Sequence, residues 1–172
     1  MSLHRIWRVG ENIDTDALAP GAYMKLDLAG IAGHCLESRY PGLAQSIGKG
    51  DVLVAGRNFG IGSSREQAVG VLVELGVHAV IAPSFSGLYF RNAFNLGLLA
   101  IVCPDADQIP EGSRVEIDTE ASVVRVFEPD ASTASRSLSC EALPRFLVDM
   151  VAAGGLLAQL ETNRSGARSA TE

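Results

Sequence analysis

Short apolar runs alternate with amphipathic segments over the first hundred residues of the chain. The alternation of polar and apolar side chains from His4 to Val9 predicts a half-buried strand. Apolar runs short enough for buried strands occupy residues 51–55, 79–82 and 98–102. Helical spacing lies between them, at 63–75 and 87–95. This order predicts an α/β fold with right-handed crossovers and a mostly parallel sheet core flanked by helices.

The apolar spacing changes after Pro104. Two short alternating runs, 115–117 and 123–127, predict a β-hairpin region in the C-terminal part, and 144–153 predicts a last helix. We expect one domain over residues 1–161, because the chain contains neither an internal repeat nor a linker. Residues 162–172 are small and polar, and we expect them to be disordered.

One segment lacks clear periodicity. Residues 11–33 contain aspartate, threonine, proline and glycine in the combinations typical of turns. We interpret this segment as a long connection, and long connections in compact domains are often functional.

Composition excludes several classes of protein. The chain has 172 residues, of which 47% are hydrophobic and 20% charged, with a net charge of −6. The basic residues are scattered, so we expect no nucleic-acid partner. No apolar run has the length of a membrane helix and no secretory signal opens the chain, so we expect a soluble, cytoplasmic protein without a membrane partner.

The strongest chemical pattern is the glycine-rich run from Gly56 to Glu66. Glycines allow a tight turn, and Ser63 with Glu66 fits a capping box that would begin a helix at Ser63. A helix N-terminus attracts anions, whereas Arg65 in the first helical turn opposes the helix dipole. A carboxylate or phosphate gripped by Arg65 explains that placement, although a capped helix with an exposed arginine explains the same residues.

Two familiar phosphate-binding motifs fit this run poorly. A P-loop requires a Gly-Lys-Ser/Thr sequence that is missing here. A dinucleotide fold places an acidic residue after the following strand, where this chain has Pro83 and Ser84.

Several ordered motifs together resemble the small subunit, or swivel domain, of the aconitase-type dehydratases, in particular the 3-isopropylmalate dehydratase and homoaconitase small subunits. The resemblance covers residues 4–160. The motifs that carry it lie at 10–16, 20–23, 56–58, 62–66, 79–82 and 91–98. It implies a swivelling β/β/α domain.

The resemblance also implies roles for single residues. Ser63 matches the base that removes a proton beside a carboxylate, and Arg65 matches the residue that supports this base and the substrate carboxylate. Ser64 matches a supporting, substrate-binding position, although simple capping explains it equally well. A serine is a weak base, so its alkoxide needs strong electrostatic support.

A second implied site is the segment that begins Tyr23, Met24, Lys25, which matches the family's mobile specificity loop. Tyr23 and Lys25 are therefore candidate substrate-binding residues. A cation at Lys25 favours a substrate with an additional anionic group, whereas a lysine in a flexible loop simply faces solvent.

We expect several other polar residues to have structural roles or no assigned role. We expect Asp14 and Asp16 to shape turns rather than to brace the site. We expect Arg91 and Asn92 to be structural residues near the site, and we assign no chemistry to the isolated residues His34 and His78.

The three cysteines Cys35, Cys103 and Cys140 are widely spaced, and we predict no metal site on this chain. The family uses a [4Fe–4S] cluster as a Lewis acid, so the resemblance implies a large iron–sulfur subunit as partner and an enzyme active only with it. The expected function is a hydro-lyase acting on a small di- or tricarboxylic hydroxy acid, foremost 3-isopropylmalate in leucine biosynthesis.

Alternatives remain open at this point. Homoaconitate, homocitrate, citramalate and dimethylmalate are other substrates of the same chemical class. A non-catalytic anion-binding module or a structural interaction domain would use the same glycine-rich turn without lyase activity.

Overall fold

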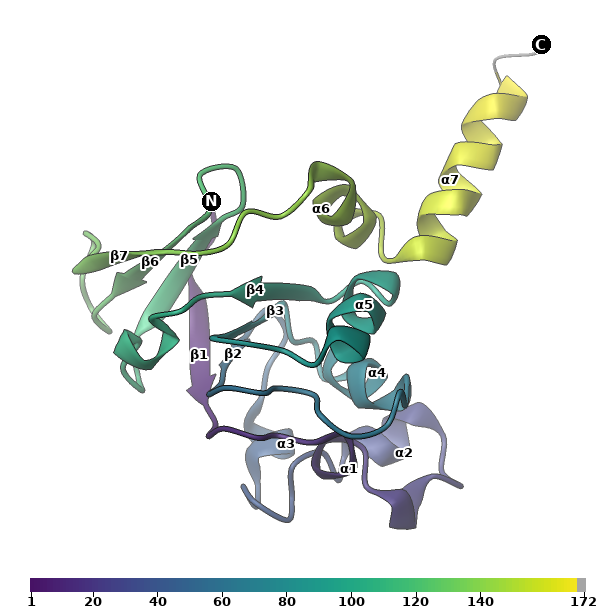
Figure 1. Cartoon of the computed structure of the whole chain (residues 1–172), viewed down its shortest axis with the longest axis horizontal. Helices are drawn as coiled ribbons and strands as arrows, with labels where there is room; N and C mark the ends of the chain where they lie inside the picture. Colours follow the sequence, from purple (N-terminus) through teal and green to yellow (C-terminus); the bar gives the residue numbers. More distant parts are fainter. Residues whose placement is uncertain (170–172) are drawn as a thin grey trace.

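A single seven-stranded sheet organises the computed structural model, which describes residues 1–169 (Figure 1). Its strands lie in the order β4-β3-β2-β1-β5-β6-β7. They are β1 (His4–Arg8), β2 (Val52–Val54), β3 (Ala79–Ala82), β4 (Leu99–Val102), β5 (Arg114–Asp118), β6 (Val123–Phe127) and β7 (Arg136–Ser139). Every side chain of β2 and β3 is buried, which explains their continuous apolar sequences.

Strand β1 joins two halves of different character. It pairs in parallel with β2, and β2, β3 and β4 continue the parallel half. On its other side β1 pairs antiparallel with β5, followed by β6 and β7. The predicted α/β class with a parallel core and a C-terminal hairpin region is therefore confirmed. Strand β7 extends the predicted hairpin to three strands.

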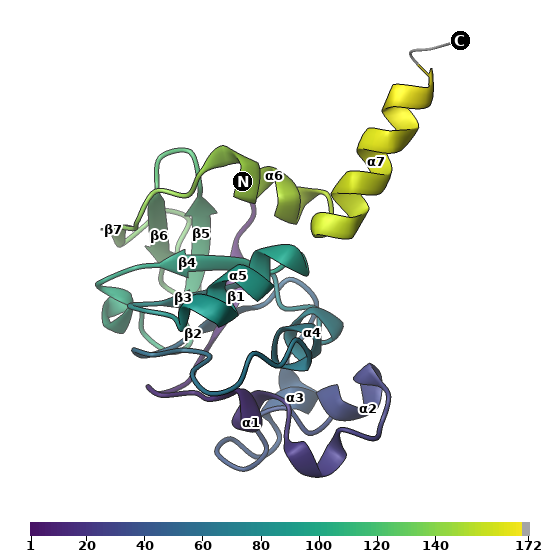
Figure 2. The same cartoon turned by 45° about the vertical axis from the view of Figure 1, so that its right-hand side comes forward.

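Helices flank the parallel half. They are α1 (Thr15–Leu18), α2 (Leu28–Ala32), α3 (Leu43–Ser46), α4 (Gln67–Glu74), α5 (Gly87–Asn95), α6 (Arg145–Ala152) and α7 (Leu156–Ser169), with 3₁₀ turns at Gly21–Tyr23 and Ala106–Gln108. Helices α4 and α5 connect successive parallel strands, as predicted. The small helices α1 to α3 gather beside α4 at one end of the molecule (Figures 1 and 2).

The segment 11–33 contains more regular structure than its sequence predicted. It folds into α1, a 3₁₀ turn and α2. Asp14 caps α1 by accepting a hydrogen bond from Ala17 N at 2.7 Å, and Asp27 caps α2 by accepting one from Gly30 N at 2.8 Å. These helices have four and five residues, too short for helical periodicity to be visible in the sequence.

The prediction that a helix begins at Ser63 was wrong, because α4 begins at Gln67. Gly62 has a φ of +111°, and the backbone from Ser63 to Arg65 has no helical structure. The N-cap of α4 is Glu66, which makes no side-chain capping hydrogen bond, so the capping box does not form. The other end agrees with the predicted range 63–75: α4 ends at Glu74, Leu75 is its C-cap, and Gly76 follows with a φ of +85°.

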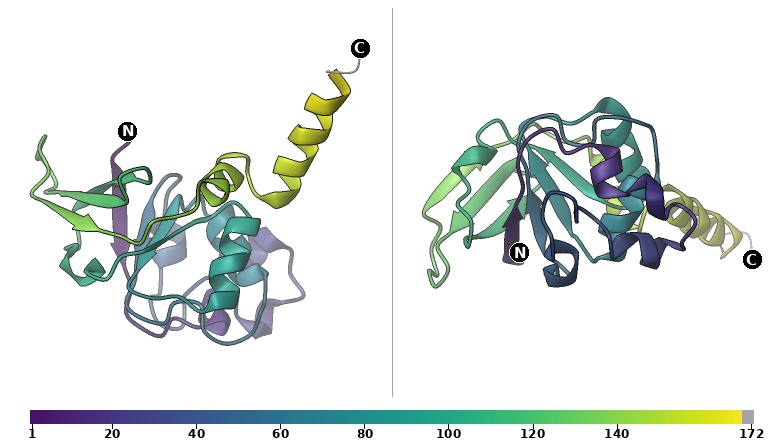
Figure 3. Two further views of the ribbon diagram at one scale, coloured as in Figure 1. Left: turned by 45° about the horizontal axis from the view of Figure 1, so that its top comes forward. Right: turned by 90° about the horizontal axis from the view of Figure 1, so that it is seen from below.

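The described chain ends in α7, which projects away from the rest of the molecule (Figures 1 and 3). None of its residues is buried. Residues 162–169, whose composition predicted disorder, continue this helix in the structure, and 170–172 lie outside the described residues. None of the helices within 1–169 is long and apolar enough to span a membrane.

Candidate active site

The glycine-rich turn is held by a segment from the start of the chain. Backbone hydrogen bonds join Gly60 N to Ile13 O at 2.7 Å and Thr15 N to Ile61 O at 2.8 Å. Two more, at 2.8 and 3.0 Å, join the stretches 10–12 and 56–57. The two loops therefore run side by side after the parallel strands β1 and β2, at the carboxyl end of the sheet where α/β proteins commonly bind ligands.

Two glycines of the turn have no room for a side chain. A Cβ at Gly60 would lie 2.1 Å from the ring of Tyr89, and one at Gly62 would lie 2.8 Å from Thr15 Oγ1. Both glycines also have positive φ angles. The glycines thus allow the turn to pack closely against α5 and α1.

Ser63 is positioned by Thr15. The Ser63 backbone N–H donates to Thr15 Oγ1 at 3.1 Å, and the two hydroxyl oxygens are 3.2 Å apart. Thr15 is buried, whereas Ser63 is exposed. The Ser63 hydroxyl therefore contacts buried Thr15 on one side and is open to solvent on the other. The Thr15 hydroxyl can donate a hydrogen bond to it.

Arg65 is also fixed by the N-terminal segment. Its Nη1 donates to the carbonyl oxygen of Ala19 at 2.6 Å and lies 3.5 Å from Asp16 Oδ1. The expectation that Arg65 lies in a first helical turn was wrong, because the helix begins two residues later. Arg65 therefore does not oppose the dipole of α4, and no bound anion is needed to explain its position. A carbonyl and a carboxylate hold its guanidinium group directly.

Ser64 lies between these two residues and is exposed. Its carbonyl oxygen accepts a hydrogen bond from Asn92 Nδ2 at 3.3 Å, so α5 supports the turn from the other side. This contact agrees with the predicted structural role of Asn92. Arg91, next to it, is exposed.

The candidate specificity loop, residues 23–26, lies beside the turn. A pocket of about 350 Å³ is bounded by the loop and α2 on one side and by α4 on the other. Its lining includes Met24, Leu26, Leu28, Glu66, Gln67 and Gly70. Lys25 is exposed on the same loop. The structure therefore brings the Lys25 loop next to the residues that follow Ser63 and Arg65.

Tyr23 is engaged within the chain. Its ring stacks on that of His34 with centroids 3.6 Å apart and an interplanar angle of 7°. A hydrogen bond with Glu37 raises the pKa of the Tyr23 hydroxyl. The sequence did not predict this contact of His34, because nothing in the spacing of 11 residues between Tyr23 and His34 indicated that their rings stack.

Both aspartates of the N-terminal motif shape turns as predicted, but Asp16 also braces the site, because it lies 3.5 Å from Arg65 Nη1. Asp14 caps α1, and Asp16 accepts a hydrogen bond from Gly21 N at 2.9 Å. Thr15, which lies between them, was missed as a site residue. A threonine between two turn-forming aspartates was the available signal, but its pairing with Ser63 depends on a contact 48 residues away.

The cysteines do not fit an iron–sulfur cluster. Cys35 is buried, and burial raises the pKa of its thiol to about 12. The thiols of Cys103 and Cys140 donate to the carbonyl oxygens of Ser139 and Leu138, at 3.8 and 3.7 Å. Within residues 1–169 no three His, Cys, Asp or Glu side chains gather as a metal site requires. A cluster needs several convergent thiolates, so no chemical step is assigned to one on this chain.

Comparisons with known proteins show the family of the chain. The Aconitase C-terminal domain family matches residues 43–106, which include the whole turn. The 3-isopropylmalate dehydratase small subunit 1 of Thermotoga maritima is 37% identical over 163 residues, covering 94% of this chain and 95% of the relative. The methanogen homoaconitase small subunit of Methanothermobacter thermautotrophicus is 39% identical over 168 residues, covering 94% of each.

A solved structure extends the likeness to the fold. The crystal structure of 3-isopropylmalate dehydratase from Methanocaldococcus jannaschii superposes with a TM-score of 0.85 at 35% identity, covering 99% of this chain and 98% of that one. The fold and the site thus define an aconitase-type domain. The chain belongs to the family of 3-isopropylmalate dehydratase and homoaconitase small subunits.

Proposed function

We propose that this chain is the small subunit of a heteromeric 3-isopropylmalate dehydratase, a hydro-lyase that removes water from a small hydroxy acid and adds it back across the resulting carbon–carbon double bond. The observation that carries the proposal is the placement of an exposed Ser63 hydroxyl against buried Thr15, two residues from a fixed Arg65. Relatives with this printed name support the assignment over most of the chain.

Ser63 acts as the base. In its alkoxide form, Ser63 Oγ takes the proton from the carbon beside a substrate carboxylate. The C–H electron pair forms the double bond as the hydroxyl group leaves the neighbouring carbon, assisted by the Lewis acid that the partner's cluster would supply. The Ser63 hydroxyl returns the proton during rehydration. The hydrogen bond from Thr15 and the charge of Arg65 favour the negative form of the Ser63 oxygen. Arg65 also binds the carboxylate, because a guanidinium can make two parallel hydrogen bonds to it.

The remaining machinery belongs to a partner. The residues of this chain do not fit the [4Fe–4S] cluster that the family implies, so we propose that a large subunit holds it. Ser63 and Arg65 are exposed or partly exposed on one turn, as expected of residues presented across an interface. The enzyme is then active only as the complex of both subunits.

Homoaconitate is the second candidate substrate. Lys25 supports it, because an exposed cation on the loop beside the turn can bind a distal carboxylate. One relative carries the homoaconitase name at a similar identity. The apolar lining of the pocket beside the loop favours the isopropyl group instead.

Co-expression with the large subunit encoded by the same genome tests the proposal. The complex is expected to dehydrate 3-isopropylmalate, and Ser63→Ala is expected to lower kcat by about 10²–10⁴-fold, the usual contribution of a positioned base. Near-normal turnover of Ser63→Ala would refute the role of Ser63. A complex without any hydro-lyase activity would refute the proposed function itself.

A further inference from the structure

Three side chains beside the candidate specificity loop form one contact network. The Tyr23 ring lies flat on the His34 ring, and His34 Nδ1 lies 2.7 Å from Glu37 Oε2. The neighbouring Tyr23 side chain also lowers the pKa of Glu37. The network, here called the 23–34–37 clamp, therefore closes on itself: each of its three members interacts with the other two.

The protonation of the clamp follows from its chemistry. The hydrogen bond from His34 holds the pKa of Glu37 below its usual value, so Glu37 is a carboxylate and only accepts hydrogen bonds. The Nδ1 atom of His34 therefore carries the proton that is donated to Glu37. The same carboxylate raises the pKa of the Tyr23 hydroxyl, so Tyr23 stays protonated beside it.

The clamp holds one end of the loop, and α2 holds the other. Asp27 begins α2 by accepting the hydrogen bond from Gly30 N. Leu28 packs on α4 so closely that a Cβ at Gly70 would lie 3.1 Å from its side chain. Lys25 lies between these two anchors, exposed and beside the residues that follow the turn.

We infer that His34 and Glu37 are positioning residues for the loop that reads the substrate, because they fix Tyr23 and thereby the placement of Lys25. Neither residue touches the reacting atoms in this arrangement. The effect on substrate selection rests on the proposed function, whereas the effect on the loop does not. Loss of the clamp releases one end of the loop and increases the entropy that substrate binding must remove.

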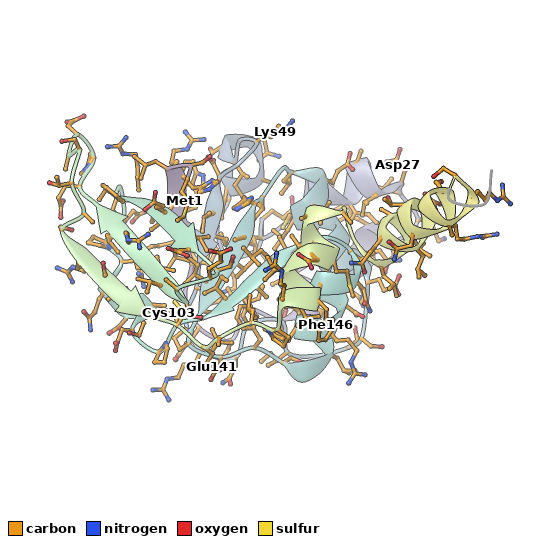
Figure 4. The ribbon with its side chains drawn as sticks, turned by 90° about the horizontal axis from the view of Figure 1, so that it is seen from above. Met1, Asp27, Lys49, Cys103, Glu141 and Phe146 are labelled. Atoms are coloured by element: carbon orange, nitrogen blue, oxygen red, sulfur yellow. The ribbon has the colours of Figure 1, made fainter. Side chains whose placement is uncertain are left out.

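Endoproteinase Lys-C gives a direct readout of the loop. The chain has two lysines, Lys25 and Lys49, and the enzyme cuts after lysine. Figure 4 shows Asp27, two residues from Lys25, well apart from Lys49. The rate of cutting after Lys25 relative to Lys49 therefore reports loop release, with Lys49 as an internal control.

Variants of the full-length chain test the clamp. His34→Ala and Glu37→Ala are expected to raise the Lys25:Lys49 cutting ratio at least fivefold, and His34→Phe, which keeps a ring for stacking, is expected to recover part of the change. Phe146→Ala is the control, because it removes an exposed ring from α6 that lies apart from both Asp27 and Lys49 (Figure 4). An unchanged ratio in both His34→Ala and Glu37→Ala overturns the clamp.

The complex with the large subunit tests the consequence for catalysis. His34→Ala is expected to raise KM for a substrate with an additional carboxylate, such as homoaconitate, at least fivefold while kcat stays within twofold, since Lys25 binds that carboxylate and does not react. A raised cutting ratio with an unchanged KM overturns the positioning role. Absence of hydro-lyase activity in the wild-type complex counts against the proposed function, and the cutting ratio still decides the clamp.

Discussion

The hydroxyl oxygens of Thr15 and Ser63 lie 3.2 Å apart, although 48 residues separate them in the chain. Thr15 Oγ1 also accepts the Ser63 backbone N–H, so one buried side chain fixes both the backbone and the hydroxyl of Ser63. This relationship makes the N-terminal segment part of the candidate active site.

Removing the Thr15 hydroxyl is expected to impair catalysis by the complex. Thr15→Val keeps the shape but leaves the Ser63 N–H and Oγ without this partner, and a lost hydrogen bond of about 1–1.5 kcal/mol corresponds to about a tenfold lower kcat. Thr15→Ser keeps the hydroxyl and is expected to retain most of the activity. Steady-state kinetics of the two variants make the comparison, and equal rates would show that the hydroxyl has no catalytic part.

Replacing Lys25 is expected to change substrate preference. Lys25→Val removes an exposed cation beside an apolar pocket, so kcat/KM for carboxylated substrates should fall about tenfold, while that for 3-isopropylmalate should stay the same or rise. The measurement is the ratio of the two values in the complex. If the ratio does not change, Lys25 does not read substrate charge.

Gly60 and Gly87 provide a pair of alanine substitutions with opposite expectations. Gly60→Ala places a Cβ 2.1 Å from the Tyr89 ring at a φ of +81°, and we expect it to lower the free energy of unfolding by more than about 2 kcal/mol. Gly87→Ala meets nothing within 4 Å at the start of α5, and we expect a change within about 1 kcal/mol. Urea unfolding measures both; similar values would contradict the packing of the turn against α5.

The stacked residues His4 and His78 are expected to make stability depend on pH. Burial lowers the pKa of His78, and the charge of His4 lowers it further. The unfolded chain therefore binds a proton first as the pH falls through the ordinary histidine pKa of 6.5, so stability is lost with acidification from there until the folded pKa is reached. His78→Asn should flatten this slope in urea unfolding between pH 8 and pH 5; an unchanged slope would exclude His78 as its source.

The sequence predicted the buried parallel strands and the helices between them because the pattern of apolar residues within each element is enough to identify it. Strands β2 and β3 are apolar throughout, and the spacing of α5 matches its observed bounds. The start of α4 was mispredicted for the opposite reason. The residues Ser63 to Glu66 favour a cap locally, but pairing with residues 13–15 draws the backbone away from the helix.

In the candidate site, too, residues that are neighbours in the sequence were predicted and contacts between distant residues were not. Ser63, Ser64 and Arg65 were found because they are consecutive in the chain. Thr15 and His34 were missed, since their partners lie 48 and 11 residues away and no periodicity connects them. Loops have no periodic pattern of apolar residues, so the sequence does not show which loops contact each other. Their contacts follow from the order of the strands in the sheet.

The hydrogen bond from Arg65 Nη1 to Ala19 O has a consequence for assembly. A free arginine side chain carries about 2 kcal/mol of rotamer entropy, which is lost when it grips a ligand. Here folding of the small subunit alone already restricts that freedom. In the proposed complex, the geometry of this arginine would be set before either the large subunit or a carboxylate binds.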